Sequence, residues 1–139
     1  METISNLKEL LKNMEPTLSK EKLCIASIDE SELLSLASHI DSITDIFREK
    51  EGLSIVFSEE IREEVESLTE SKISGPFALI TLNVYSDLMA VGFLAKIAEA
   101  LAKEKISVNA FSAYHHDHLL IPYERKEDAL KTLQKLQKS

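Results

Sequence analysis

The sequence predicts an α+β fold made of two consecutive halves that share the element order β-α-β-β-α. Two pairs of windows carry this prediction: residues 23–34 can be overlaid on residues 78–89, and residues 53–60 on residues 119–126. The offsets of 55 and 66 residues are the length of roughly one supersecondary unit. A chain with such an internal repeat is expected to fold as two small units of the same kind.

The first half, expected over residues 1–72, begins with a short amphipathic helix that ends before Pro16. Its apolar residues recur at helical spacing: Ile4, Leu7, Leu10, Leu11 and Met14. Thr3 or Ser5 is available as the N-cap of this helix.

The remainder of the first half alternates strands and helices. The apolar run 23–28 predicts a strand, and the polar residues 29–32 lead into a short helix. The apolar runs 43–47 and 53–57 predict a hairpin. A second helix starts at Ser58 and carries many acidic residues near its positive end.

The second half, expected over residues 73–139, repeats this order. Apolar runs and helical spacing predict a central strand, a helix, two strands and a last helix, in turn: residues 77–84, 89–104, 106–114, 119–123 and 129–136. In both halves the order corresponds to the split β-α-β, or ferredoxin-like, arrangement, with an antiparallel sheet and helices on one face.

Composition excludes several classes of function. Of 139 residues, 24 are acidic and 16 are basic, and no three basic residues are consecutive, so a nucleic-acid partner is not expected. Only three glycines are present, far apart, which disfavours the glycine-rich turns of dinucleotide and P-loop nucleotide sites. We therefore expect no cofactor.

The charge is divided unevenly along the chain. The part up to Lys72 holds 17 acidic and 8 basic residues, and the remainder holds 7 acidic and 8 basic residues. A solvated acidic face accounts for the excess in the first part.

The single cysteine and the hydropathy pattern predict a cytoplasmic protein without a membrane span. Cys24 has no internal disulfide partner, and no stretch approaches the ~18 consecutive apolar residues of a transmembrane helix. Cys24 lies in an apolar run, where a cysteine is more often a buried, unreactive thiol than a nucleophile.

The second half contains segments that resemble a known family. The short sequence AVG at 90–92 and ISVNAFSAYHHDHLLIP at 106–122, within the segment 77–133, resemble an ACT domain. With the more divergent segment 46–60, the whole chain looks like the small bacterial proteins built from two tandem ACT-like halves. Most members of that group are functionally uncharacterised.

The resemblance implies a regulatory or sensor protein, not an enzyme, that binds a small molecule, usually an amino acid, between ACT domains. It also implies a homodimer formed through ACT sheets or helices. The residues that correspond to the family's ligand-binding turn and second strand are Ser86, Asp87, Met89, Ala90, Val91, Gly92 and Asn109. The family's Asp-Pro-Gly pattern is altered here, because Leu88 to Val91 separate Asp87 from Gly92 and proline is absent.

The turn from Ser86 to Gly92 has the chemistry for such a ligand. A helix start presents free N–H groups to a carboxylate, and Asp87 can receive an ammonium group. The alternative is structural: Ser86 or Asp87 caps the helix, and Gly92 allows close packing.

The cluster from His115 to His118 supports a second hypothesis, a small metal-binding protein or enzyme. Alternation on a strand points His116 and His118 to one side, with His115 and Asp117 on the other, so two ligands at most converge from one face. A polar hairpin turn is the simpler interpretation, and these histidines can also line a ligand pocket. A third hypothesis is a ligand-free oligomerisation module.

Overall fold

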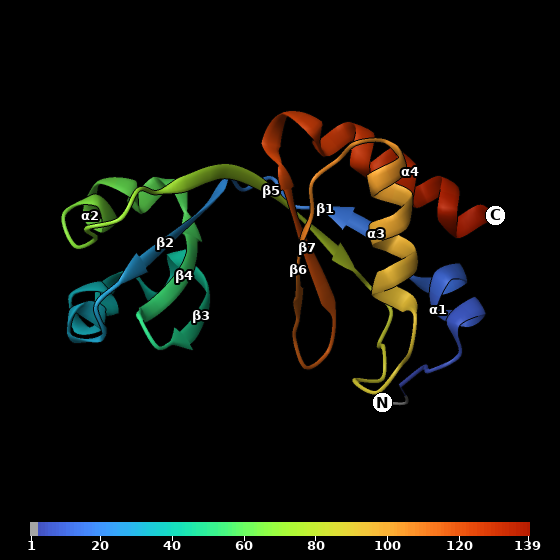
Figure 1. Ribbon diagram of the computed structural model, residues 1–139, viewed down its shortest axis with the longest axis horizontal. Helices are drawn as coiled ribbons and strands as arrows, with labels where there is room; N and C mark the ends of the chain where they lie inside the picture. The colour runs from blue at the N-terminus through green and yellow to red at the C-terminus, as the bar shows by residue number, and fades with distance from the viewer. Residues whose placement is uncertain (1–2) are drawn as a thin grey trace. The chain divides into compact units, whose positions relative to one another are not determined.

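The computed structural model describes residues 3–139 and groups them into two compact units (Figure 1). The central unit comprises residues 21–77. The interrupted unit comprises residues 3–20 and residues 78–139, which lie on either side of the central unit in the sequence. The α+β class predicted from the sequence is confirmed.

The central unit has an antiparallel arrangement of strands in the order β3-β4-β2-β5, in which β5 contributes its first residues. Its strands are β2 (Leu23–Ile28), β3 (Ile43–Glu49), β4 (Gly52–Ser58) and the start of β5 (Ser74–Leu82). Its helical elements are η1 (Glu30–Ser42), η2 (Glu59–Ile61) and α2 (Arg62–Glu66). In the register of the β2 and β4 pair, Leu23 lies opposite Ser58 and Ile28 opposite Leu53.

The core of the central unit follows from alternation along β2 and β4, whose inward residues pack against the helical elements. Its buried members are Cys24, Ala26, Ile28, Leu36, Leu53, Ile55, Phe57, Ile61, Val65 and Ile73. The predicted hairpin of β3 and β4 is present and turns before Gly52, where a Cβ atom would lie 2.6 Å from the carbonyl oxygen of Ile28. Glycine is therefore required at this position.

The interrupted unit has the strand order β6-β7-β5-β1. Its strands are β1 (Pro16–Leu18), the remainder of β5, β6 (Asn109–Ser112) and β7 (Asp117–Pro122). Its helical elements are α1 (Leu7–Asn13), α3 (Phe93–Lys103), η3 (Tyr123–Arg125) and α4 (Lys126–Lys138). Strand β1 runs antiparallel to β5, with Pro16 opposite Leu82 and Leu18 opposite Ile80.

The helices α1, α3 and α4 lie on the same side of strands β5, β6 and β7 in the interrupted unit (Figure 1). One hydrophobic core joins these layers, and its buried members are Leu10, Met14, Ile80, Leu82, Val84, Phe93, Ile97, Leu101, Ile106, Leu119, Ile121, Ala129 and Leu133. Leu10 and Met14 come from the leading segment and are fully buried. This segment therefore completes the core of a unit that is formed mainly by the C-terminal residues.

The leading helix lies in the interrupted unit, whereas the sequence placed it in the half 1–72. Pairing of β1 with β5 brings α1 to the core of the interrupted unit, whereas residues 21–77 form the central unit without it. Short local patterns do not encode this long-range pairing. Strand β1 itself, three residues long, was not predicted.

Two local predictions also differ from the structure. The N-cap of α1 is Asn6, not Thr3 or Ser5, since the Asn6 side chain accepts a hydrogen bond from the Glu9 N–H at 3.1 Å. Helix α3 begins at Phe93, later than the predicted 89–104, because Gly92 has φ of 90° and ends the preceding loop in a left-handed conformation.

The charge asymmetry coincides with the two units. The central unit holds 14 acidic and 5 basic residues, and the rest of the chain holds 10 acidic and 11 basic residues. The acidic excess thus belongs entirely to the central unit.

Candidate functional site

The turn between β5 and α3 is held in place by the N-terminal segment. The Ile4 N–H donates to the Tyr85 carbonyl at 2.8 Å, and the Asp87 N–H donates to the Ile4 carbonyl at 2.9 Å. The Asp87 carboxylate accepts a hydrogen bond from the Met89 N–H at 2.8 Å and one from the Thr3 hydroxyl at 3.4 Å. Asp87 therefore organises its own loop and is half-buried.

The start of α3 lacks a side-chain cap, because its N-cap is Gly92. At φ of 90° this glycine directs the loop into the helix, and any side chain here is strained, although the nearest atom to a Cβ at this position, on Leu7, would be 3.5 Å away. By contrast, side chains cap α1, η1 and η2. The first N–H groups of α3 thus donate no hydrogen bond to a capping side chain, and the positive end of the helix dipole lies at this turn.

A buried pair of polar side chains joins this turn to the β6–β7 hairpin. The Ser86 hydroxyl donates to the Asp117 carboxylate at 3.0 Å, and both residues are more than 90% buried. Asp117 opens β7, and Ser112 lies opposite it in the register of β6 and β7. A buried carboxylate bound to a neutral hydroxyl introduces negative charge close to the turn.

A cavity of 160 Å³ lies between these groups and the start of α3. Its walls include Ser86, Asp87, Gly92, Phe93 and Asp117. The cavity therefore places two carboxylates near a helix N-terminus, a combination suited to a small zwitterion. A second cavity of 330 Å³ adjoins it and shares Ser86 and Asp87 in its lining.

The structure brings together part of the predicted ligand-binding set. Ser86, Asp87, Ala90 and Gly92 line the 160 Å³ cavity. Met89 and Val91 point outward, with exposed fractions of 84% and 83%, and do not line it. Asn109 is exposed at the opposite end of β6 from Ser112 and lies outside both cavities of the turn.

Sequence reasoning missed several residues of the site. Asp117 was grouped with the histidines, and its burial and its hydrogen bond with Ser86 depend on a contact across 31 positions of sequence. The contribution of Thr3 and Ile4 had no local signal, because these residues meet the turn through a contact across more than 80 positions of sequence.

The histidines form an aromatic cluster with two tyrosines. The ring centroids of Tyr85 and His116 are 5.0 Å apart, and those of Tyr114 and His115 are also 5.0 Å apart. His118 Nδ1 lies 2.9 Å from the Thr81 hydroxyl, within the sheet of the interrupted unit. Among residues 3–139, no group of three or more His, Cys, Asp or Glu side chains is arranged to hold a metal ion.

Cys24 is fully buried in β2. Burial raises the pKa of the Cys24 thiol, and the nearby Arg62 guanidinium, whose Nη1 lies 3.7 Å from Sγ, partly opposes this shift. The pKa of Arg62 is itself raised, chiefly by its hydrogen bond to Glu66. The thiol thus lacks both the access and the lowered pKa of a nucleophile.

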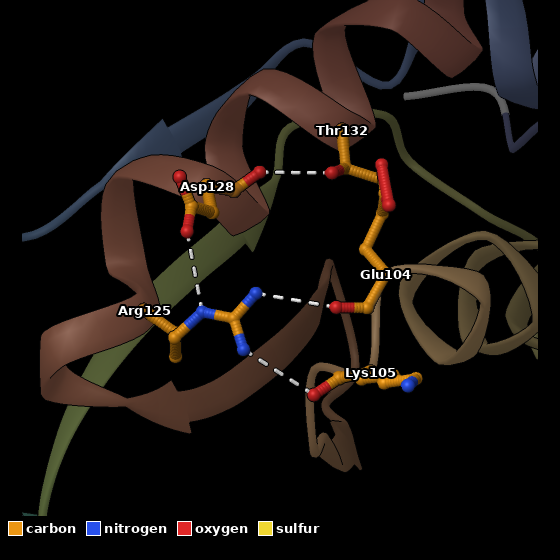
Figure 2. Close-up of polar contacts among 5 residues, drawn as sticks. All are labelled: Glu104, Lys105, Arg125, Asp128 and Thr132. Atoms are coloured by element: carbon orange, nitrogen blue, oxygen red, sulfur yellow. Dashed lines mark hydrogen bonds and ion pairs between the residues drawn. The ribbon is translucent and has the colours of Figure 1, made fainter.

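A hollow of 540 Å³ lies between the C-terminal end of α3 and the helix α4. Figure 2 shows the polar contacts beside it. Arg125 donates to the Asp128 carboxylate at 3.2 Å and to the carbonyl oxygens of Glu104 and Lys105 at 3.2 and 3.3 Å. The Thr132 hydroxyl donates to the Asp128 carbonyl at 2.8 Å. Since the guanidinium binds the carbonyls of the C-cap residue Glu104 and of Lys105, which follow α3, this hollow has a structural explanation.

Comparison with known proteins identifies the family. The sequence profile of the ACT domain matches residues 76–135. A protein of unknown function from Vibrio cholerae, described as a possible transport protein, is 34% identical, with 94% of this chain and 95% of that chain covered and a TM-score of 0.75. The chain belongs to the ACT-domain proteins. No curated protein matches the sequence.

Two further ACT-like structures share the fold of this ACT-domain protein at low identity. The regulatory subunit of aspartate kinase from Thermus thermophilus, in its ligand-free form, is 13% identical, with 90% of this chain and 98% of that chain covered and a TM-score of 0.69. The regulatory subunit of aspartate kinase from Thermus flavus is 13% identical, with coverages of 87% and 95% and a TM-score of 0.68.

The helices of this ACT-domain protein do not meet the requirements of a membrane span. Within residues 3–139, none is both long and apolar enough to cross a bilayer.

Proposed function

We propose that this ACT-domain protein is a non-catalytic regulatory protein that binds a small molecule, an amino acid, at the turn between β5 and α3. The observation that carries the proposal is the uncapped start of α3 beside the 160 Å³ cavity, with Asp87 and Asp117 on its walls. The helix N–H groups donate hydrogen bonds to the ligand carboxylate, and the carboxylate side chains attract its ammonium group. The similar Thermus proteins are regulatory subunits of aspartate kinase, which supports a regulatory output.

The size of the cavity limits the ligand. Ligand pockets span about 300–1,000 Å³, so 160 Å³ admits the carboxylate and ammonium groups of an amino acid and little more. Binding acts by population shift, because ordering of the turn by the ligand favours the conformation that a partner recognises.

The proposal includes a second ACT-like half in the chain. The central unit has the strand order β3-β4-β2-β5, and the interrupted unit has the equivalent order β6-β7-β5-β1. Each unit takes its last strand from a segment beyond the β-α-β-β-α core: the start of β5 in one and β1 in the other. The equivalent strand orders, with the last strand drawn from outside each core, support two ACT-like halves. The boundaries of these halves differ from 1–72 and 73–139.

The proposal also includes a cytoplasmic homodimer. The free, buried Cys24 is compatible with a reducing compartment. Exposed apolar side chains at the turn supply a surface that a second copy can cover: Leu88, Met89 and Val91. Light scattering with and without the stabilising amino acid measures the oligomeric state, and a mass that never exceeds one chain contradicts this part of the proposal.

Thermal-shift and calorimetric screens over the twenty standard amino acids test the ligand. A true ligand at 100 times its Kd stabilises the fold by about 2.7 kcal/mol. Asp87→Ala is expected to weaken binding about tenfold or more, since hydrogen bonds to charged groups contribute ~1.5–3 kcal/mol. Asp41→Ala, which removes an exposed carboxylate of the central unit, is the matched control and should bind as the wild type does.

The structural alternative makes a different prediction. If Asp87 only holds the loop, Asp87→Ala lowers the melting temperature of the free protein, and no amino acid raises the melting temperature of either protein. Ser86→Ala separates the two roles further, because it removes the hydroxyl bound to Asp117 and leaves the hydrogen bonds of Asp87 in place. A wild type that no amino acid stabilises would overturn the proposal.

A further inference from the structure

The 330 Å³ cavity beside the turn has an aromatic wall that the proposed amino-acid site does not use. Tyr85, Tyr114 and His115 line it, together with Thr3, Asp87 and Leu88. Tyr85 precedes the turn, whereas Tyr114 and His115 lie in the connection between β6 and β7. Two separate segments of the interrupted unit therefore bring their rings to one cavity.

The three rings form a chain of contacts. The centroids of Tyr114 and His115 are 5.0 Å apart with an interplanar angle of 46°, and those of Tyr85 and His115 are 6.2 Å apart with an angle of 80°. Both spacings lie in the range of favourable aromatic pairs. The exposed fraction of Tyr114, 82%, leaves its ring accessible.

The charge of the cavity is negative. Asp87 is the carboxylate of its lining, and among residues 3–139 no Lys or Arg side chain lines it. Hydrogen bonds from the Met89 N–H and the Thr3 hydroxyl fix the Asp87 carboxylate at the cavity. A carboxylate beside π-electron faces repels anions and attracts cations.

We propose that this cavity binds an organic ammonium ion. The tyrosine rings contact its alkyl groups and stabilise its positive charge by cation–π interaction, and Asp87 adds a charge-charge attraction. A volume of 330 Å³ is at the lower end of ligand cavities and fits a small organic cation. The same interaction already occurs within the unit, where Lys126 Nζ lies 3.5 Å from the centroid of the Tyr123 ring.

This inference does not require an amino acid at the start of α3. The two sites share Ser86, Asp87 and Leu88, but the aromatic residues line only the larger cavity and Gly92 lines only the smaller one. Variants of the tyrosines therefore report on the ammonium site alone.

The probes are choline and its neutral isostere 3,3-dimethyl-1-butanol, with tetramethylammonium as the simplest cation. Titration followed by ligand ¹H NMR should show saturable binding of both cations and an upfield ring-current shift of their methyl protons. Removing one aromatic ring in Tyr114→Leu should weaken choline binding by about 2- to 30-fold, whereas Tyr114→Phe retains it. Tyr123→Leu, which changes a tyrosine already covered by Lys126, is the matched control and should bind as the wild type does.

Two results would overturn the inference: no saturable shift of either cation with the wild-type protein, or equal affinity for choline and its neutral isostere. Unchanged choline affinity in Tyr114→Leu has the same consequence. The amino-acid proposal is tested separately, by measuring whether amino acids stabilise the Tyr114→Leu protein. This stabilisation should persist. Each proposal can therefore fail while the other stands.

Discussion

The central and interrupted units share a strand order, yet the helix that follows the first strand is capped differently in each. In the central unit, the Asp29 side chain accepts hydrogen bonds from the N–H and the hydroxyl of Ser31, so the start of η1 is satisfied by the chain itself. In the interrupted unit, Gly92 leaves the start of α3 without a side-chain cap. Equivalent positions of one topology can thus be closed for stability or left available for a ligand.

The distribution of charge also differs between the two units. The central unit carries the acidic excess, and the interrupted unit, with 10 acidic and 11 basic residues, contains the two cavities of the turn. Stability changes in one unit should therefore be separable from changes in ligand binding in the other.

The largest expected effect tests whether each unit has its own core. Leu10→Ala and Leu36→Ala remove fully or almost fully buried leucines from the two cores and should each lower the free energy of unfolding by about 2–5 kcal/mol. Hydrogen exchange followed by NMR should show that Leu10→Ala reduces protection within 78–139 more than within 21–77. Leu36→Ala should give the reverse pattern.

The exposed Leu34 supplies the control for this comparison, since it lies near Leu36 in η1 with an exposed fraction of 85%. Leu34→Ala should change stability by less than about 0.5 kcal/mol. Equal loss of protection across both units in Leu10→Ala would contradict the assignment of α1 to the interrupted unit.

A smaller effect is expected from Gly92→Ala. The substitution places a Cβ atom on a residue with φ of 90°, which should lower the free energy of unfolding by about 1–2 kcal/mol. Because the loop enters α3 through this residue, amino-acid affinity should fall as well. Denaturant unfolding and calorimetry measure the two effects. Val91→Ala, a change at an exposed residue of the same loop that has no positive φ and lines neither cavity, is the control.

The smallest effect concerns the pH dependence of the Asp29 cap. Hydrogen bonds from the Ser31 hydroxyl and N–H lower the pKa of Asp29 below its ordinary value. The ionised form is thus favoured by folding, so the contribution is present above the unfolded-state pKa and is lost as the pH falls through the lower folded-state pKa.

An NMR titration of the Asp29 carboxyl carbon measures this shift. Ser31→Ala removes the hydroxyl and should return the pKa of Asp29 part of the way toward its ordinary value. Ser71→Ala, a serine elsewhere on the surface of the central unit, should leave the titration unchanged. An Asp29 titration that is identical in the wild type and Ser31→Ala would show that the hydroxyl does not stabilise the carboxylate.

Much of the fold was predictable because its signals are local. The run Leu23–Ile28 was predicted as a strand and is β2, and the predicted hairpin corresponds to β3 and β4. The last helix also lies where leucines recur at helical spacing. Burial of these apolar runs requires only one partner layer, so periodicity is sufficient to find them.

The candidate site was only partly predictable. The family resemblance led to the turn from Ser86 to Gly92, but nothing local indicated that Met89 and Val91 point outward or that Asn109 lies away from the cavities. Side-chain direction in a loop depends on backbone angles that the residue types do not determine.

Local sequence patterns were enough to establish the α+β class, the alternation of strands and helices and the acidic first part. Only packing in three dimensions revealed that α1 and β1 complete the interrupted unit, that Ser86 meets Asp117, and that two tyrosines and a histidine face one cavity. The reason is the sequence separation of the contacts. Periodicity and caps depend on residues a few positions apart, whereas these contacts join distant segments, and only the assembled core offsets the entropy lost in closing the long loops between them.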